Sequence, residues 1–284
     1  MSLALRGDRR RRRDVMNAVA TAGITLAGVG VVVPLLAILL FIVVKGLPAL
    51  NLSLITENPG PAGVAGGGLK NSIVGSGVLV GLALLFGLPP AIATGIFLAE
   101  YARGTRAGFA VRFLLDVLAG VPSITIGVFV YVAVVTSMGK FTAFAGGIAL
   151  ALILLPVVSR TTEEMLLLVP QSTREAAYAL GVPRWRTIIG VVMPAASSGV
   201  LTGIVLAAAR IAGEAAPLLF TALGNNFYST GVFRPIDALP LRIFTYATGP
   251  FPYWHDQAWA GSLILVLFVL VFSIGARLAL GRRA

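Results

Sequence analysis

Long apolar stretches alternate with shorter polar ones along this 284-residue chain. A helix that crosses the hydrocarbon core of a bilayer needs about 20 consecutive, mostly apolar residues. The segments that meet this requirement are residues 18–44, 71–99, 112–136, 142–159, 191–219 and 258–280. The pattern therefore predicts an all-α polytopic membrane protein with about six transmembrane helices.

Composition supports a membrane protein and narrows its chemistry. Hydrophobic residues make up 57% of the chain and charged residues 12%, whereas soluble domains have about 25% charged residues. The net charge of +11 does not indicate nucleic acid binding, because the basic residues lie at the ends of apolar segments. With no cysteine and one histidine, we expect neither disulfides nor a metal site.

The distribution of Lys and Arg predicts the orientation. If the N-terminus is inside, the inner segments hold 16 of these residues and the outer loops hold 5. Such a bias marks the cytoplasmic side, so both ends are expected in the cytoplasm of a multi-pass protein of the cell membrane. The expected parts are a basic tail (1–17), a first transmembrane helix (18–45), an external Gly/Pro-rich loop (46–70) and a core (71–284), whose external loop is about 221–257.

The loop after the fourth apolar segment has the features of a short cytoplasmic helix. Ser172 and Glu175 are spaced as a capping box, which predicts a helix start. Gly181 suits the position just past a helix C-terminus, and Pro183 prevents continuation. We therefore expect a helix at about 172–181, and because two turns are marginal alone in water, something must hold it.

The same loop resembles the EAA signature of ABC importer permeases. That signature reads E-A-A-x-x-x-G-x9-I-x-L-P, and here Val and Met replace its Ile and Leu at 191 and 193. The matching residues are Glu175, Ala176, Ala177 and Gly181. The resemblance implies that this helix couples the permease to a separate ATP-hydrolysing subunit.

Two charged residues interrupt the fifth apolar segment. Arg210 and Glu214 are four residues apart, so a continuous helix places them on one face. A charge at the bilayer centre costs about 2.5–3.5 kcal/mol on insertion scales, so both should face protein or a wet cavity. They form either a structural ion pair or a transient anion site on a transport path, since a guanidinium matches phosphate geometry.

A narrower resemblance rests on three motifs. R-x-x-G-E-x-A-P-L-L-F-T-A begins at Arg210, R-T-T-E at Arg160, and R-E-A-A-Y-A-L-G at Arg174. Together they resemble the PstA-type permease subunits of phosphate ABC importers. The resemblance implies a type I importer (MetI-like) fold and a substrate pathway that includes Arg210, Glu214 and Arg160. Arg160 is also interpretable as an anchor at the inner membrane boundary.

The resemblance also implies partners. They are a second, PstC-like permease, a PstB-like ATP-binding subunit dimer, a PstS-like extracytoplasmic phosphate-binding protein and membrane lipid. The chain lacks the P-loop pattern G-x-x-x-x-G-K-[ST], so no cofactor is expected on it, and ATP and Mg would act in the partner.

The alternatives are cargoes such as sulfate or molybdate, an intramembrane enzyme, or a scaffold. An enzyme is disfavoured because His255 is expected outside and the spans lack an acid pair. A scaffold would leave the costly charges Arg210 and Glu214 unexplained.

Overall fold

The computed structural model describes residues 2–281, and these form a helical membrane protein. Within that part of the chain, five helices have the length and apolarity to cross a bilayer: Arg13–Ala49, Lys70–Tyr101, Ala143–Leu168, Arg184–Ala212 and Pro252–Gly275. Arg106–Gly120 and Ser123–Met138 would together make a sixth, but they meet at an angle of 101°.

The shorter elements lie between and within these spans. The α-helices are α1 (Ser2–Gly46), α2 (Leu52–Thr56), α3 (Lys70–Ile96), α4 (Arg106–Gly120), α5 (Ser123–Val130), α6 (Thr136–Met138), α7 (Ala143–Leu168), α8 (Gln171–Ala179), α9 (Arg184–Thr187), α10 (Met193–Ala212), α11 (Ala216–Thr221), α12 (Leu239–Ala247) and α13 (Pro252–Gly281). A 3₁₀ turn η1 (Leu47–Ala49) and π-helical stretches η2 (Phe97–Tyr101), η3 (Tyr131–Val135) and η4 (Ile188–Val192) join them.

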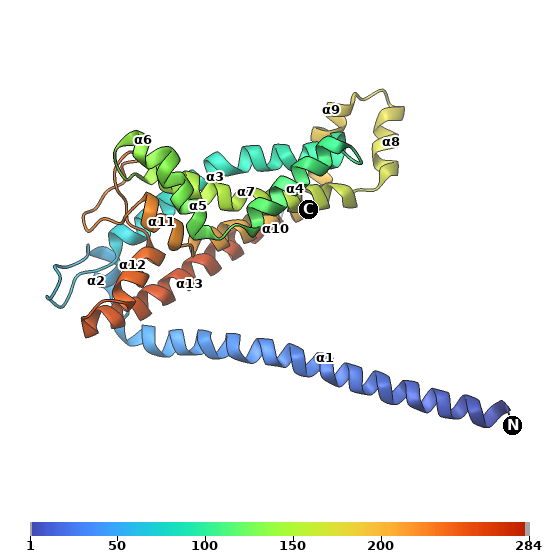
Figure 1. Ribbon diagram of the computed structural model, residues 1–284, viewed down its shortest axis with the longest axis horizontal. Helices are drawn as coiled ribbons and strands as arrows, with labels where there is room; N and C mark the ends of the chain where they lie inside the picture. Colours follow the sequence, from blue (N-terminus) through green and yellow to red (C-terminus); the bar gives the residue numbers. More distant parts are fainter. Residues whose placement is uncertain (1, 282–284) are drawn as a thin grey trace.

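Helix α1 stands apart from the rest of the molecule along most of its length (Figure 1). Near its own C-terminus, α1 contacts α13. There the rings of Phe41 and Trp259 pack edge to face, with their centroids 5.1 Å apart. Gly46 is needed there, because a Cβ on it would lie 2.7 Å from the Trp259 carbonyl oxygen. The predicted tail, 1–17, is not a separate element, since from Ser2 onward its backbone belongs to α1.

The centre of the fold is the packing of α3 against α7, with α5, α10 and α11 around them. Gly95 and Gly147 of these helices allow the close approach, and a Cβ on Gly95 would lie 2.5 Å from the Thr162 Cβ. Close approach through small residues is how helices associate in lipid, where burial from water gives no driving force. The largest buried side chains in this core include Leu79, Leu150, Leu154, Ile211 and Leu218.

The structure corrects three of the predicted spans. The third, 112–136, is not one straight helix, because the backbone is extended at Val121 and Pro122. The fourth is longer than predicted and continues to Leu168. The fifth ends at Ala212 instead of 219, and Pro217 lies in the first turn of the separate helix α11.

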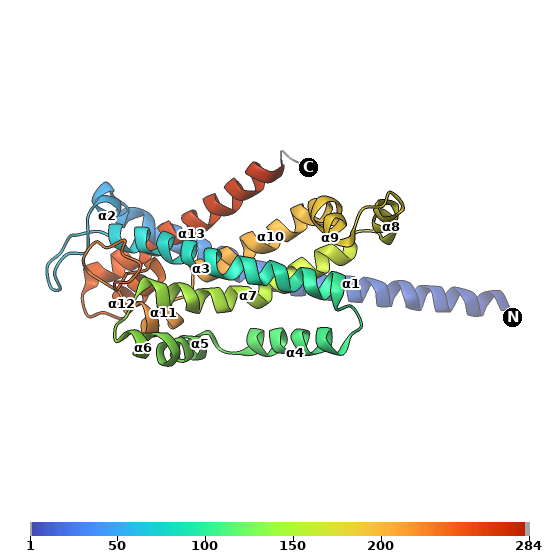
Figure 2. The same ribbon diagram turned by 90° about the horizontal axis from the view of Figure 1, so that it is seen from above.

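The two ends of the molecule differ in content. The N-terminal end of α1, the end of α13 and helix α8 lie toward one end, which we name the α8 end (Figures 1 and 2). Helices α2, α11 and α12 lie toward the other, named the α12 end (Figure 2). The predicted external loop, about 221–257, is folded there and contains α12 and the start of α13.

Candidate functional site

Helix α8 is the short helix expected from the sequence, but it begins differently. Its N-cap is Pro170, and no side chain caps it. Ser172 is therefore inside the helix, and the predicted capping box is wrong. The C-terminal prediction is confirmed, because Gly181 has φ +77°. The amides of Gly181 and Val182 donate to the carbonyls of Tyr178 and Ala177 at 2.9 and 3.2 Å, which is a Schellman motif.

A buried arginine fastens α8 to the transmembrane helices. The side chains of Arg174 and Glu100 are 9% and 5% exposed, and they pair at 2.7 Å. Arg174 also donates to the carbonyls of Leu166 and Val169 at 2.7 and 2.6 Å. Glu100 belongs to η2, the continuation of α3. Helix α8 is thus attached to the ends of α3 and α7 through one guanidinium group that donates four hydrogen bonds.

The remaining faces of α8 are open. Glu175 and Ala176 are exposed, and Ala177 is buried against the protein. Leu180, just past the helix, is 84% exposed. A surface hollow of about 520 Å³ lies beside these residues, lined by Ser172, Thr173, Ala176, Ala177, Leu180 and Val191. A marginal helix that presents apolar surface in this way suits docking to another protein.

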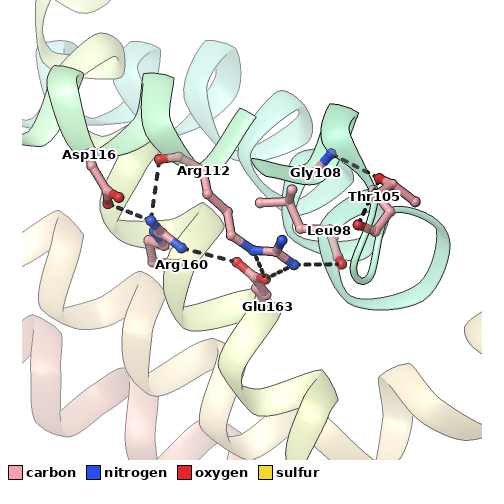
Figure 3. Close-up of polar contacts among 8 residues, drawn as sticks. Leu98, Thr105, Gly108, Arg112, Asp116, Arg160 and Glu163 are labelled. Atoms are coloured by element: carbon pink, nitrogen blue, oxygen red, sulfur yellow. Dashed lines mark hydrogen bonds and ion pairs between the residues drawn. The ribbon is translucent and has the colours of Figure 1, made fainter. Parts of the chain in front are cut away.

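Alternating charges connect α4 to α7 in a second cluster (Figure 3). The Glu163 carboxylate is 5% exposed and accepts from Arg112 at 2.7 Å and from Arg160 at 3.5 Å. Arg160 also pairs with Asp116 at 2.5 Å and donates to the Arg112 carbonyl at 3.3 Å. Arg112 further donates to the Leu98 carbonyl at 3.2 Å. The cluster consists of four charged side chains. Within it, Arg160 has two carboxylates and one backbone carbonyl as partners.

Arg160 does not lie at the end of its helix. Because α7 continues to Leu168, Arg160 lies about two turns inside the helix. Its side chain is 31% exposed, so part of it stays accessible.

Arg210 is the more open of the two arginines. Its side chain is 58% exposed, and its contact with Glu214 is long, at 3.9 Å. Glu214 does not share a helical face with it as expected, because α10 ends at Ala212 and the chain turns at Gly213. The pair is nevertheless preserved across this break. An exposed guanidinium at the end of an apolar helix can receive an anion by multiple N–H donors.

The packing of α7 on α10 separates the two arginines. Gly203 faces Thr161, since a Cβ there would lie 2.3 Å from the Thr161 Cγ2, and Gly199 faces Met165. The helices are therefore antiparallel, and Arg160 lies level with Gly203. Arg210 is two further turns, or about 10 Å, toward the α12 end. The two arginines thus lie at different depths along the bundle.

The sequence reasoning missed the partners that fix these side chains. Glu163 is part of the R-T-T-E motif but was given no role. Glu100, at the end of an apolar run, was not predicted as a site residue. A carboxylate in or near a membrane segment is costly unless a cation lies close to it. This cost could have indicated that each acid has a cationic partner. Which cation serves could not be read from the chain, because Glu100 and Arg174 are 74 positions apart.

The α12 end has a buried pair of its own. Asp237 accepts from Arg242 at 2.7 Å and from the Ser72 hydroxyl at 2.5 Å, and Arg242 also donates to the Asn226 side chain at 2.8 Å. Burial raises the pKa of Asp237, and the Arg242 guanidinium and the Ser72 hydroxyl oppose that rise. With both groups nearly inaccessible, this pair ties the 221–257 segment to the start of α3.

Comparison with known proteins places the chain in a family. Residues 91–282 match the model of the family described as binding-protein-dependent transport system inner membrane component. The phosphate transport system permease protein PstA of Yersinia pestis is 51% identical over 249 residues, which is 88% of this chain and 84% of that protein. The probable PstA of Methanocaldococcus jannaschii is 39% identical over 88% of each.

Solved structures share the fold. A methionine ABC transporter, MetNI, in an inward-facing conformation aligns with a TM-score of 0.58 at 17% identity, over 75% of this chain and 93% of the matched chain. A bacterial alginate ABC transporter aligns with a TM-score of 0.56 at 16% identity, over 75% and 78%. The expected MetI-like architecture of a multi-pass membrane protein is confirmed. The chain belongs to the binding-protein-dependent transport system inner membrane component family, and within it to the PstA group of phosphate transport system permease proteins.

Proposed function

We propose that this chain is a permease subunit of an ATP-driven importer that moves inorganic phosphate across the cytoplasmic membrane. The observation that carries the proposal is Arg210, a guanidinium 58% exposed at the end of a membrane helix in a chain of the PstA group. Arginine stays charged and offers a fork of donors to phosphate oxygens. Glu214, 3.9 Å away, weakens the attraction so that the anion can leave, as conduction requires.

The α8 end faces the cytoplasm in this proposal, with both termini on that side. An ATP-binding subunit docks on Glu175, Ala176 and the exposed Leu180, while Ala177 and Gly181 shape the helix and its end. Hydrolysis of ATP with Mg in that subunit moves α8, and the Arg174–Glu100 pair passes the movement to α3. The chain itself supplies no catalytic residue.

The remaining partners are a second, PstC-like permease, and a PstS-like binding protein at the α12 end. The ATPase is PstB-like. Phosphate passes near Arg210, between the two permeases, as the assembly alternates between outward and inward openings. Arg160 serves the path only through its 31% exposed part, because Asp116, Glu163 and the Arg112 carbonyl occupy three of its five N–H donors.

The cargo is tested by uptake in proteoliposomes that contain the complete complex and its binding protein. We expect radiolabelled phosphate to accumulate only with hydrolysable ATP on the α8 side, and equal concentrations of sulfate or molybdate to leave its uptake unchanged. ATP-dependent accumulation of sulfate or molybdate without phosphate would replace the proposal with the other-oxyanion alternative.

Docking is tested by Leu180→Glu, which leaves the Arg174 anchor untouched. We expect the ATPase to be lost on purification, because a carboxylate enters an apolar contact. Phe227→Glu is the matched control, since Phe227 is 81% exposed but lies in the 221–257 segment. Retention of the ATPase with normal turnover by Leu180→Glu would exclude α8 as the docking element.

A further inference from the structure

A second hollow lies between α8 and the ends of the transmembrane helices. It is distinct from the surface hollow beside Leu180. Its volume is about 520 Å³, and it is lined by the ends of two membrane helices and by α8. The polar and aromatic residues of the lining are Glu100, Tyr101, Arg103, Gln171, Arg174, Tyr178 and Arg184. Three guanidinium groups thus surround the hollow, against one carboxylate.

The three guanidinium groups of the hollow differ in how many of their N–H donors have partners. Arg174 uses four of its five N–H donors on Glu100 and two carbonyls. The Arg184 guanidinium stacks on the Tyr101 ring at 4.6 Å and donates to the Glu100 carbonyl, which leaves most of its five N–H donors free. Arg103 is exposed, and its side chain makes no ion pair or hydrogen bond with the residues whose side chains the structure describes, 13–275 and 278. The hollow therefore carries uncompensated positive charge.

The depth of the hollow indicates what reaches it. The candidate span of 32 residues that contains α3 ends at Tyr101, and the candidate span of 29 residues that contains α10 begins at Arg184. Both helices are longer than the roughly 20 residues that cross the hydrocarbon core, so we infer that these two ends reach the headgroup region. The Tyr101 and Tyr178 rings are 48% and 39% exposed, as expected of aromatic side chains at the interface. Basic pockets between membrane helices on the cytoplasmic side suit anionic headgroups.

We propose that this hollow binds a phosphate group through Arg103 and Arg184, carried by an anionic phospholipid of the adjacent leaflet or by free inorganic phosphate. The forked donors of the two arginines fit phosphate oxygens, and the tyrosine rings fit the glycerol of a lipid. Because Arg174 and Tyr178 belong to α8, an occupant also touches the helix that docks the ATPase. The contact with an ATPase-docking helix rests on the proposed function, whereas the binding of a phosphate group in the hollow does not.

Binding is tested on the purified complex in an Arg210→Gln background, which removes the transport path as a phosphate site. Phosphatidylglycerol is titrated and bound lipid is counted by native mass spectrometry; radiolabelled inorganic phosphate is titrated separately in phosphatidylcholine nanodiscs. Arg103→Gln and Arg184→Gln are compared with Arg186→Gln, a neighbouring cation that lies over Trp185 and not in the hollow.

We expect the affinity for phosphatidylglycerol to fall about fivefold for each of the two substitutions and to stay unchanged in the control, following the contribution of one basic residue near an anionic surface. A matching loss of inorganic phosphate binding, with lipid binding unchanged, assigns the site to free phosphate. Unchanged binding of both ligands would overturn the proposal.

Two further outcomes are informative. If Arg103→Gln and Arg184→Gln release the ATPase while lipid and phosphate binding persist, an acidic surface of that subunit occupies the hollow and the proposal fails. Uptake by the unsubstituted complex is measured in parallel. Absence of phosphate uptake together with the expected lipid loss would refute the transport proposal and leave the lipid site standing.

Discussion

Arg160 and Arg210 are the same residue type on neighbouring membrane helices, yet their surroundings differ. Arg160 pairs with two carboxylates and donates to a backbone carbonyl, and 31% of its side chain is exposed. Arg210 has one carboxylate at 3.9 Å and is 58% exposed. An arginine inside a membrane protein must be compensated. The first is compensated by its own chain, and the second is left available to a ligand or a partner.

We infer from this difference that the Arg160 cluster mainly holds the fold together and that Arg210 is mainly available for transport. The Arg160 cluster joins α4 to α7 and would hold the bent third segment in place whether or not an ion is present. The Arg210 site binds its own carboxylate weakly, so an arriving anion displaces little. We therefore propose that the substrate role belongs mainly to Arg210, and four substitutions test that division.

The largest effect is expected from Arg210→Gln. Uptake of phosphate should fall roughly 100-fold, because charge-assisted hydrogen bonds worth up to about 3 kcal/mol are lost. Co-purification of the partner subunits should be unchanged. Arg234→Gln, at an exposed position of the 221–257 segment, is the control. Normal uptake by Arg210→Gln would remove the residue from the mechanism.

A loss of stability is expected from Glu163→Gln. The amide oxygen can still accept a hydrogen bond, but the negative charge that Arg112 and Arg160 share is lost, at a cost of about 1.5–3 kcal/mol, the range for hydrogen bonds to charged groups. Thermal unfolding in detergent measures the change. The adjacent Glu164→Gln is a matched control, since Glu164 is exposed. Equal melting temperatures for the two variants would show that the cluster contributes nothing to the framework.

Glu100→Gln should have a smaller effect, confined to coupling. The amide oxygen still accepts from Arg174, which also keeps its two backbone carbonyls, so α8 loosens without detaching. We expect phosphate moved per ATP hydrolysed to fall about fivefold, as when roughly 1 kcal/mol of charged hydrogen bonding is lost. Glu57→Gln, an exposed acid in the loop after α2, is the control.

The ratio of uptake to hydrolysis distinguishes this effect from misfolding, which lowers both rates together. A ratio unchanged by Glu100→Gln would exclude the pair as the connection between α8 and α3.

The smallest effect is expected from Asp116→Asn. This carboxylate is 65% exposed, and an exposed ion pair contributes less than about 1 kcal/mol. Thermal unfolding and uptake should both stay near those of the unsubstituted chain. Loss of uptake as severe as in Arg210→Gln, with stability unchanged, would show that Asp116 orients Arg160 toward the substrate and would reverse the division drawn here.

The amino-acid sequence was sufficient for the features that depend on a residue and its near neighbours. Apolar runs located every membrane segment, because partition into lipid is a property of about 20 successive side chains. The helix at α8 and the left-handed Gly181 followed from local preferences. The motifs led to the PstA group, since spacing along the chain preserves family signatures.

Only the tertiary structure decided where the third and fifth membrane segments break and which charges meet. Pro122 breaks the third segment, and α10 ends before Glu214, although the residues on both sides of each break are mostly apolar. Arg112 and Glu163 are 51 positions apart, and Arg174 and Glu100 are 74 apart, so their pairing depends on how α3, α4 and α7 pack. Packing sets the local environment of each arginine, and that environment separates the paired Arg160 from the open Arg210.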